Sequence, residues 1–308
     1  MAYPTCNTDE HGSRCKAVLL VNSKSRVGIE GFEETRRTLE NDGFELVHAK
    51  VFATVNGLIR QAREATQAEV PLIIVGGGDG TINAVSGLIA HSKSTLAIIP
   101  LGTGNAFARD LRIPMNVAGA CEVIKSGLPI DVDLGQIQNR FFVNVATMGL
   151  TTEIARELTN PMKKLYGRFA YAVALARGIR HLKPFRVFLD TENGLNEFEC
   201  MQLVIGNGRL HAGPFPVLPD ASLCAGKFSI YALKGNQRSE LIKYALLLPG
   251  GHHAMLSQVH SEYAKAGRIR TVPAVNVIID GEISGRTPVA FAAIPGALKV
   301  MAPADFDG

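Results

Sequence analysis

The sequence predicts an α/β fold in two parts: a doubly wound parallel sheet in the N-terminal half, and an antiparallel, β-sandwich-like arrangement in the C-terminal half. Strand and helix signals alternate between residues 16 and 102, which is typical of a parallel sheet covered by helices. After about residue 183, short strand signals follow one another with turns between them, which is typical of antiparallel sheets. A chain of 308 residues is long enough for two such domains.

The N-terminal half is expected to contain four strands and three helices. Short apolar runs that stop at polar or glycine residues predict strands over 16–23, 44–53, 71–77 and 94–102. Helical periodicity predicts helices over 29–43, 55–70 and 81–92. Ligands of parallel sheets bind beyond the carboxyl ends of the strands, so the loops that follow three of these strands should meet at one site. These loops read VNSKS, GGGDGT and PLGTGN.

The C-terminal half begins with an apolar segment over 128–150 and a long helical stretch over 163–182. Strands are then expected over 184–194, 198–208, 226–235, 271–282 and 288–303. We place the boundary between the halves near 133–138, which gives expected domains of 14–134 and 135–308.

Composition argues against several classes of protein. The net charge of +4 is mild and no nucleic-acid-binding motif is present, so no nucleic-acid partner is expected. The absence of a CxxC pair argues against a structural zinc site. The chain has no run of eighteen apolar residues, and its first fifteen residues lack the apolar core of a signal peptide. We therefore expect a cytoplasmic protein that is able to contact the inner face of a membrane peripherally.

The segment GGGDGTIN places one carboxylate among glycines at the end of a predicted strand. Glycines before a helix expose backbone N–H groups to phosphate oxygens, and the Thr81 hydroxyl can add a donor. Asp79 repels phosphate, but it can hold Mg²⁺ through water or accept a proton. A plain glycine turn in which Asp79 caps a helix explains the same residues. The segment is not a Walker A loop, and Thr81 replaces the third glycine of a dinucleotide fingerprint.

The segment PLGTGN repeats this arrangement after the next strand, where Gly102 and Gly104 flank Thr103. Asn105 then begins a helix, so helix capping alone also explains the segment. Two glycine turns, each after a buried strand, favour a nucleotide site over two unrelated caps.

The segment IIDGE places Asp280 and Glu282 on either side of one glycine after an apolar strand. Paired carboxylates at the end of a strand can serve acid–base chemistry. An ordinary β-turn, with Asp first and Gly beyond it, is the interpretation that this segment favours when taken alone.

Together, GGDGT, PLGTGN, NGRLHAGPFPVLPDA and DGE resemble in order and spacing the diacylglycerol kinase catalytic domain family, and more closely its bacterial lipid kinases related to diacylglycerol and sphingosine kinases. The resemblance runs from about residue 15 to 302. GGDGT is shared with NAD kinases and, loosely, with phosphofructokinases, whereas PLGTGN is more specific to the lipid kinases. The segment GRFAYAVALARGIRHLKPFRV resembles their linker helix and following strand.

The resemblance implies an N-terminal domain that binds ATP, a C-terminal domain that helps to hold lipid, and an active site in the cleft between them. It implies that the nucleotide-binding residues are Asn22, Ser23, Lys24, Ser25, Thr54, Gly77, Gly78, Gly80, Thr81, Asn83, Gly102, Thr103, Gly104 and Asn105. The family's general base and its neighbour fall on Asp280 and Glu282. Asp79 matches an acid that organises water and Mg²⁺, and sphingosine kinases give this acid the catalytic role itself.

We therefore expect an ATP-dependent lipid kinase that transfers the γ-phosphate to a lipid hydroxyl, most simply that of a diacylglycerol-like acceptor. Asp280 would be the base, Glu282 would orient it or bind the nucleotide, and Asp79 would hold Mg²⁺ through water. An NAD kinase-like enzyme and a non-catalytic nucleotide or lipid sensor on the same fold are the alternatives. A homodimer is compatible with a chain of this size.

Three positions depart from the family pattern. The early loop, which usually reads NPxSG, reads NSKSR over 22–26, so it loses Pro and Gly but offers two cations to phosphate. Ala84 stands where an acid usually follows GGDGTIN. Cys224 and Ala225 replace an acidic pair that often belongs to a structural metal site, so we do not expect that accessory site here.

The stretch 158–189 contains no acidic residue. Its basic residues are Lys163, Lys164, Arg168, Arg177, Arg180, Lys183 and Arg186. A basic surface gains about 1 kcal/mol per charge beside anionic lipid, so this stretch is a candidate membrane contact. A solvated helix face explains it equally well.

Overall fold

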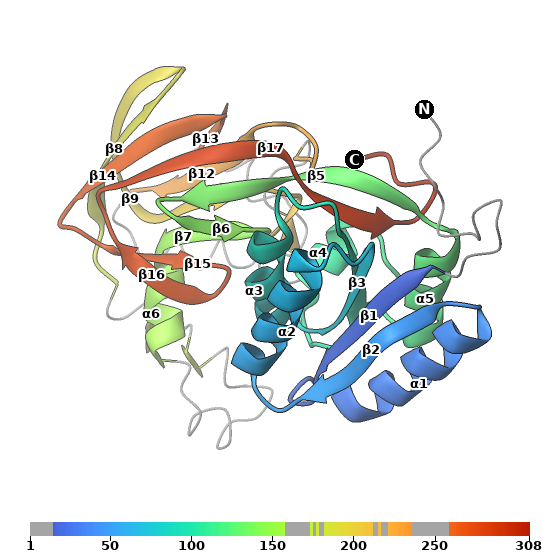
Figure 1. Ribbon diagram of the computed structural model, residues 1–308. Helices are drawn as coiled ribbons and strands as arrows, with labels where there is room; N and C mark the ends of the chain where they lie inside the picture. The colour runs from blue at the N-terminus through green and yellow to red at the C-terminus, as the bar shows by residue number, and fades with distance from the viewer. Residues whose placement is uncertain are drawn as a thin grey trace.

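In the computed structural model, the described residues are 15–157, 173–174, 177–178, 182–211, 215–216, 221–235 and 259–308. A sheet of 15 strands runs through both halves of the molecule (Figure 1). Its N-terminal strands are parallel and its C-terminal strands are antiparallel. The predicted α/β class is therefore confirmed.

Four parallel strands form the sheet of the N-terminal half, in the order β4–β3–β1–β2. They are β1 (Lys16–Asn22), β2 (Glu45–Phe52), β3 (Leu72–Gly77) and β4 (Thr95–Pro100). β1, β3 and β4 are buried almost throughout, which explains their continuous apolar runs. Because the strands are parallel, the loops that follow them emerge at one edge of the sheet.

Helices cover both faces of this sheet (Figure 1). α1 (Gly28–Asn41) packs with α5 (Val117–Ser126) on one face, and α2 (Val55–Gln67) packs with α3 (Asp79–Ile89) on the other. A short helix, α4 (Ala106–Asp110), follows the second glycine loop. The three predicted helices are present to within a few residues, whereas α5 was not predicted.

The C-terminal half is an antiparallel sheet in the order β16–β15–β7–β9–β8–β14–β17, to which β12, β13, β5 and β6 add at the sides. The first elements are β5 (Leu128–Ile137), β6 (Arg140–Phe142), β7 (Val145–Gly149), α6 (Leu150–Glu157), β8 (Phe185–Thr191) and β9 (Gly194–Gly206). The others are β10 (Leu210–His211), β11 (Phe215–Pro216), β12 (Phe228–Lys234), β13 (Val259–Ala264), β14 (Ala266–Val272), β15 (Asn276–Ile279), β16 (Glu282–Arg286) and β17 (Val289–Ala302).

The last strand, β17, joins the two halves. It pairs antiparallel with β14 and β5, and its Val300 pairs in parallel with Leu96 of β4. Leu298 and Val300 are fully buried in the N-terminal core. The C-terminal strand therefore fixes the antiparallel half against the parallel sheet.

Two predictions need comment. The single strand expected over 271–282 is wrong, because β14 ends at Val272 and β15 begins at Asn276. Pro273 lies in the gap, and a proline has no N–H group with which to continue a ladder. The helix expected over 163–182 falls largely outside the described residues. Among the described helices, none is long and apolar enough to cross a membrane.

Candidate active site

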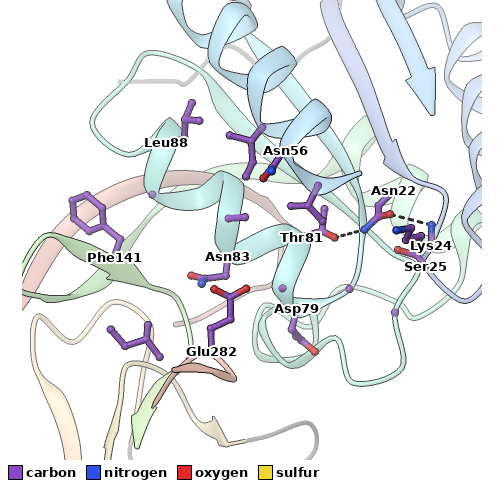
Figure 2. Close-up of a pocket in the computed structure, with 18 of the residues that line it drawn as sticks. Asn22, Lys24, Ser25, Asn56, Asp79, Thr81, Asn83, Leu88, Phe141 and Glu282 are labelled. Atoms are coloured by element: carbon purple, nitrogen blue, oxygen red, sulfur yellow. Dashed lines mark hydrogen bonds between the residues drawn. The ribbon is translucent and has the colours of Figure 1, made fainter. Parts of the chain in front are cut away.

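A cavity of about 1150 Å³ lies at the carboxyl ends of the parallel strands. Its walls come from the three loops after β1, β3 and β4, from α2 and α3, from β6, and from the β15–β16 hairpin. Figure 2 shows Asn22, Thr81, Asp79 and Glu282 around this space. The convergence that the parallel topology predicts is thus observed.

The two glycine loops contact each other through their backbones. A Cβ atom on Gly102 would lie 2.4 Å from the Cα of Gly78, and one on Gly77 would lie 2.6 Å from the Cβ of Thr81. None of these glycines has a φ in the left-handed region. Gly78 and Gly102 are therefore required by the close approach of the two loops, and Gly77 by the approach of Thr81 within its own loop; none is required by an unusual turn.

Gly80 differs from the other glycines of this loop. Nothing lies within 4 Å of the place where its Cβ would stand, and the residue lines the cavity. It belongs to the first turn of α3, which follows the N-cap residue Gly78. A helix N-terminus that opens onto a cavity is a favourable place for an anion.

Asp79 ties the two glycine loops together. Its Oδ1 accepts a hydrogen bond from the backbone N–H of Ala106, the first residue of α4. Asp79 is thus a helix cap, but for α4 and not for its own helix. Its Oδ2 has no hydrogen-bond partner within the described part of the chain, and the residue lines the cavity.

Asn105 braces the second loop and does not cap α4 with its side chain. Its Oδ1 accepts from the N–H of Gly102 at 3.0 Å, and its Nδ2 donates to the carbonyl of Gly102 at 3.1 Å. The left-handed backbone of Asn105, with a φ of +51°, permits this folding back.

Asn22, at the end of β1, connects the early loop to α3 (Figure 2). Its Nδ2 donates to Thr81 Oγ1 at 2.9 Å, and its Oδ1 accepts from the backbone N–H of Lys24 at 3.0 Å. Asn22 is buried, so both bonds lie in a poorly solvated place and hold the loop firmly.

Ser23 and Thr54 make contacts away from the cavity. The Ser23 hydroxyl donates to the carbonyl of Phe52 at 3.2 Å. The Thr54 hydroxyl accepts from the N–H of Gly57 at 3.3 Å and so caps α2. Neither residue lines the cavity, and their expected contacts with a nucleotide stay predictions.

Asp280 and Gly281 form the two-residue loop of the β15–β16 hairpin, with φ values of +44° and +89°. Type I′ hairpins need left-handed backbone at both positions, which explains the Asp-Gly pair. The turn interpretation of DGE is therefore right for the local backbone. The turn also directs the Asp280 carboxylate toward the start of β7, the strand that pairs with β15.

Three backbone N–H groups donate to the Asp280 carboxylate, from Val143 at 2.9 Å, Asn144 at 3.1 Å and Val145 at 2.8 Å. Burial nevertheless raises the pKa of Asp280 to about 6, and the three hydrogen bonds only oppose this shift. The charge of Asp79 raises the pKa of Asp280 further, so the two acids lie within electrostatic range. A carboxylate with such a pKa is suited to accept a proton near neutral pH.

Glu282 lies on the cavity wall and faces Asn83 (Figure 2). Its carboxylate is 3.6 Å from the Nη2 of Arg140, whose Nη1 donates to the Ser284 hydroxyl at 2.6 Å. The Oδ1 of Asn83 is buried without a hydrogen-bond partner among the described residues. A ligand group in the cavity could satisfy this oxygen.

Twelve of the predicted site residues line the cavity: Asn22, Lys24, Ser25, Gly78, Asp79, Gly80, Thr81, Asn83, Gly102, Thr103, Gly104 and Glu282. Ser23, Thr54, Gly77, Asn105 and Asp280 do not line it. Gly77 packs against Thr81, and Asn105 is hydrogen-bonded to Gly102, so both contact residues that line the cavity. Asp280 lies in the chain between Ile279 and Glu282, and both of these residues line the cavity. The roles of all these residues stay predictions.

The sequence interpretation missed one face of α2 and the β6 wall. Asn56, Ile59 and Arg63 line the cavity, and their spacing of three and four residues is the signal that could have placed them on one helix face. Phe141 of β6 packs against Gly87 of α3, where a Cβ would lie 3.1 Å from the Phe141 Cβ. No local signal predicts this contact between distant segments.

Around Cys224, where the family often has a structural metal site, the polar groups are hydrogen-bonded to other groups of the protein. The Cys224 thiol lies 3.5 Å from the carbonyl of Asp131, and the backbone N–H groups of Gly226 and Gly296 donate to the carboxylate of Asp133. Burial raises the pKa of the Cys224 thiol, and the two nearby carboxylates add to the shift. No group of three or more potential metal-binding side chains occurs within the described ranges.

Comparison with known proteins agrees with this geometry. Residues 16–137 match the diacylglycerol kinase catalytic domain, and residues 144–302 match the YegS C-terminal NAD kinase beta sandwich-like domain. A diacylglycerol kinase of Staphylococcus epidermidis is 30% identical over 271 residues, which cover 87% of this chain and 85% of that relative. The chain belongs to the diacylglycerol kinase family. It is accordingly a lipid kinase, as the sequence predicts.

Other members of the family give the same result. A Staphylococcus aureus diacylglycerol kinase is also 30% identical over 271 residues, covering 87% of this chain and 85% of that relative. A solved diacylglycerol kinase structure from Bacillus anthracis str. Sterne has a TM-score of 0.72 at 21% identity, covering 95% of this chain and 98% of that chain. A second structure from the same organism has a TM-score of 0.82 at 24% identity, covering 95% and 97%. These two structures show that the fold is shared.

Proposed function

We propose that this lipid kinase transfers the γ-phosphate of ATP to the hydroxyl group of a diacylglycerol-like lipid. The observation that carries the proposal is the meeting of the two glycine loops at one cavity, with Asp79 tying them together. Bare backbone and the N-terminus of α3 offer N–H groups and a positive dipole end to phosphate oxygens.

Cations on the cavity wall support a triphosphate in this place. Lys24 and Arg26 from the early loop and Arg63 from α2 line the same cavity as the glycine loops. Phosphoryl transfer depends mainly on positioning and on neutralising charge, so several cations around bare backbone suit it well. Thr81 adds a hydroxyl that is already held by Asn22.

The residues present fit a magnesium ion. Asp79 has one carboxylate oxygen without a partner in the described structure, and the Asn83 amide oxygen is buried and unpaired there as well. Mg²⁺ prefers oxygen ligands and is usually held by one or two carboxylates together with substrate phosphates and water. When bound, Mg²⁺ would neutralise phosphate charge. Asp79 would hold it through water, as the sequence analysis expects.

We assign the proton acceptor to Asp280. The lipid oxygen forms a bond to the γ-phosphorus, the bond from that phosphorus to the ADP oxygen breaks, and the hydroxyl proton passes to the Asp280 carboxylate. The raised pKa of Asp280, about 6, supports this role. Glu282, on the cavity wall beside it, would orient the acceptor or contact the nucleotide.

In this proposal, residues 14–134 hold the nucleotide and 135–308 hold the lipid. Contact with a membrane surface would involve the basic stretch, in which Lys183 and Arg186 are exposed. Arg186 pairs only loosely with Glu197, at 3.4 Å between largely exposed side chains, so it stays available to anionic lipid. The residues Lys163, Lys164, Arg168 and Arg180 of this stretch lie outside the described residues.

A phosphorylation screen tests the proposal. The purified protein, γ-labelled ATP and Mg²⁺ are incubated with mixed micelles that carry diacylglycerol, monoacylglycerol or a sphingoid base, and separately with NAD. We expect label in diacylglycerol and almost none after Asp79→Ala or Asp280→Ala. Label in NAD would favour the NAD kinase alternative, and ATP binding without label in any acceptor would favour the sensor. Near-normal transfer by both variants would contradict the assigned roles.

A further inference from the structure

An ion pair between a buried carboxylate and a half-buried guanidinium joins the second glycine loop to the antiparallel half. Asp110, the last residue of α4, has a side chain that is only 4% exposed, and its Oδ1 lies 3.2 Å from the Nε of Arg209. The backbone N–H of Arg209 donates to Asp110 Oδ2 at 2.7 Å, and the guanidinium donates to the Asp110 carbonyl at 3.2 Å. Arg209 therefore holds α4 by both its backbone and its side chain.

The chain is shaped to admit this pair. A Cβ on Gly208 would lie 1.9 Å from Asp110 Oδ2, so only glycine lets the carboxylate reach the backbone of Arg209. A buried carboxylate is unfavourable unless it is paired and hydrogen-bonded, and here both conditions are met. Packing of α4 against the neighbouring loop would not require a buried carboxylate, a paired guanidinium and a glycine at position 208.

Asn207 extends the contact toward Asp280. Its Nδ2 donates to the carbonyls of Asp133 at 2.7 Å and Val143 at 3.2 Å, and its backbone N–H donates to the Asn144 carbonyl at 2.8 Å. Asn207 is buried. It thus holds the carbonyl side of the segment whose N–H groups hold the Asp280 carboxylate.

The N-terminal end of α4 is hydrogen-bonded to Asp79 of α3. Asp79 accepts from the N–H of Ala106 at the first residue of this helix, and Asp110 is its fifth and last residue. A path therefore runs from Asp79 by a hydrogen bond to α4 and on to the ion pair. It follows the covalent backbone from Arg209 to Asn207, and Asn207 is hydrogen-bonded to the segment that fixes Asp280. None of Asp110, Asn207 and Arg209 lines the cavity, so they would not contact a substrate there.

We propose that Asp110, Arg209 and Asn207 are positioning residues that set the placement of Asp79 relative to Asp280 across the cleft. This inference rests on the proposed function, because it gives the placement a purpose in phosphoryl transfer. Binding of ATP uses backbone groups and cations of several loops, so the path should matter less for ATP affinity than for transfer to the lipid, which needs Asp79 and Asp280 in register. A small misplacement of reacting groups lowers rates by up to roughly a hundredfold.

The test compares Arg209→Met with Arg36→Met. Both variants lose one guanidinium that pairs with carboxylates, but Arg36 lies on α1 and pairs with Glu33 and Glu40 away from the cavity. Steady-state kinetics with γ-labelled ATP and diacylglycerol micelles are measured far below each unfolding transition. Amide hydrogen exchange is followed at 143–145 and at Ala106. If Arg209→Met does not fold, Asp110→Asn/Arg209→Met is used, since it leaves no buried charge unpaired.

We expect the Arg209 variant to lose kcat by roughly ten- to a hundredfold. Its KM for ATP should stay within about twofold of the wild type, and its amides at 143–145 and at Ala106 should exchange faster. Arg36→Met should match the wild type in all three measurements. Wild-type kcat in the folded Arg209 variant, or a loss confined to ATP affinity, would overturn the inference. If the wild type labels no lipid, the proposed function fails, and the positioning path is then judged by amide exchange alone. Faster exchange at 143–145 in the Arg209 variant than in the wild type supports the path, and unchanged exchange overturns it.

Discussion

The Cα of Gly78 lies only 2.4 Å from the point at which a Cβ on Gly102 would stand, so the two glycine loops meet backbone against backbone. This contact explains why neither Gly78 nor Gly102 carries a side chain. It also brings the loops after β3 and β4 to one wall of the cavity, where Asp79 and Thr103 lie.

Gly102→Ala and Gly80→Ala should therefore have opposite effects on folding. The first introduces a Cβ into backbone and should lower the free energy of unfolding by about 1–3 kcal/mol. The second has open space around it within the first turn of α3, so stability should be unchanged or rise by up to about 1 kcal/mol. Urea unfolding measures both. Equal stability of Gly102→Ala and the wild type would show that the loops do not pack in this way.

Gly80→Ala should still weaken ATP binding, because its new methyl group would point into the cavity. Titration with ATP should show a Kd raised severalfold in a variant that is at least as stable as the wild type. Unchanged affinity would mean that phosphate oxygens do not approach the first turn of α3.

The pH dependence of lipid phosphorylation should report Asp280. A general base works when ionised, and the pKa of Asp280 is raised to about 6, so kcat/KM should fall as the pH drops below about 6. An ordinary aspartate would keep activity down to about pH 4. Glu282→Gln is the control: whatever activity this variant retains should fall below the same pH as in the wild type, because Glu282 is largely exposed and paired with Arg140. An acidic limb near pH 4 in the wild type would exclude Asp280 as the base.

The same raised pKa predicts the sign of a stability change. The unfolded state, with an ordinary pKa of 3.8, releases the proton before the folded state does. The contribution of Asp280 to the free energy of unfolding should therefore fall as the pH rises from about 4 to about 6. Chemical unfolding of the wild type and of Asp280→Asn across this range measures the contribution as a difference. A difference that does not change with pH would contradict the raised pKa.

Arg63→Ala should raise the KM for ATP severalfold, because Arg63 lines the cavity beside the predicted phosphate loops. Arg60→Ala is the matched control: it removes the same side chain from the same helix, at a position that does not line the cavity. The difference between the two variants should shrink at high salt, as expected for a partly exposed charge. Equal effects of both substitutions would assign Arg63 to the surface and not to the nucleotide.

The sequence was informative wherever chemistry follows from local order. Parallel strands ending in VNSKS, GGGDGT and PLGTGN predicted a site at one edge of the sheet, and the cavity lies there. Local order did not reveal why the glycines are needed, since the requirement comes from contact between loops and not from a left-handed φ. It also could not indicate which helix Asp79 caps, because the Asp79 carboxylate accepts from α4, which begins 27 residues later.

Long-range contacts were beyond the reach of sequence periodicity. The neighbourhood of Asp280 and Asp79 depends on β15 pairing with β7 and on β17 returning to β4, and no local pattern predicts either pairing. The resemblance to lipid kinases suggested that these acids act together, but the hydrogen bonds that hold Asp280 come from the backbone of 143–145, which no side-chain motif can indicate.

A crystal structure with Mg²⁺ and a non-hydrolysable ATP analogue tests the proposed nucleotide site most directly. The triphosphate should lie against the backbone of Gly78–Thr81 and Gly102–Gly104, with the metal reached by Asp79 through water and Asp280 on the same side of the cleft. A triphosphate bound away from both glycine loops would contradict the proposal, whatever the activity of the protein in solution.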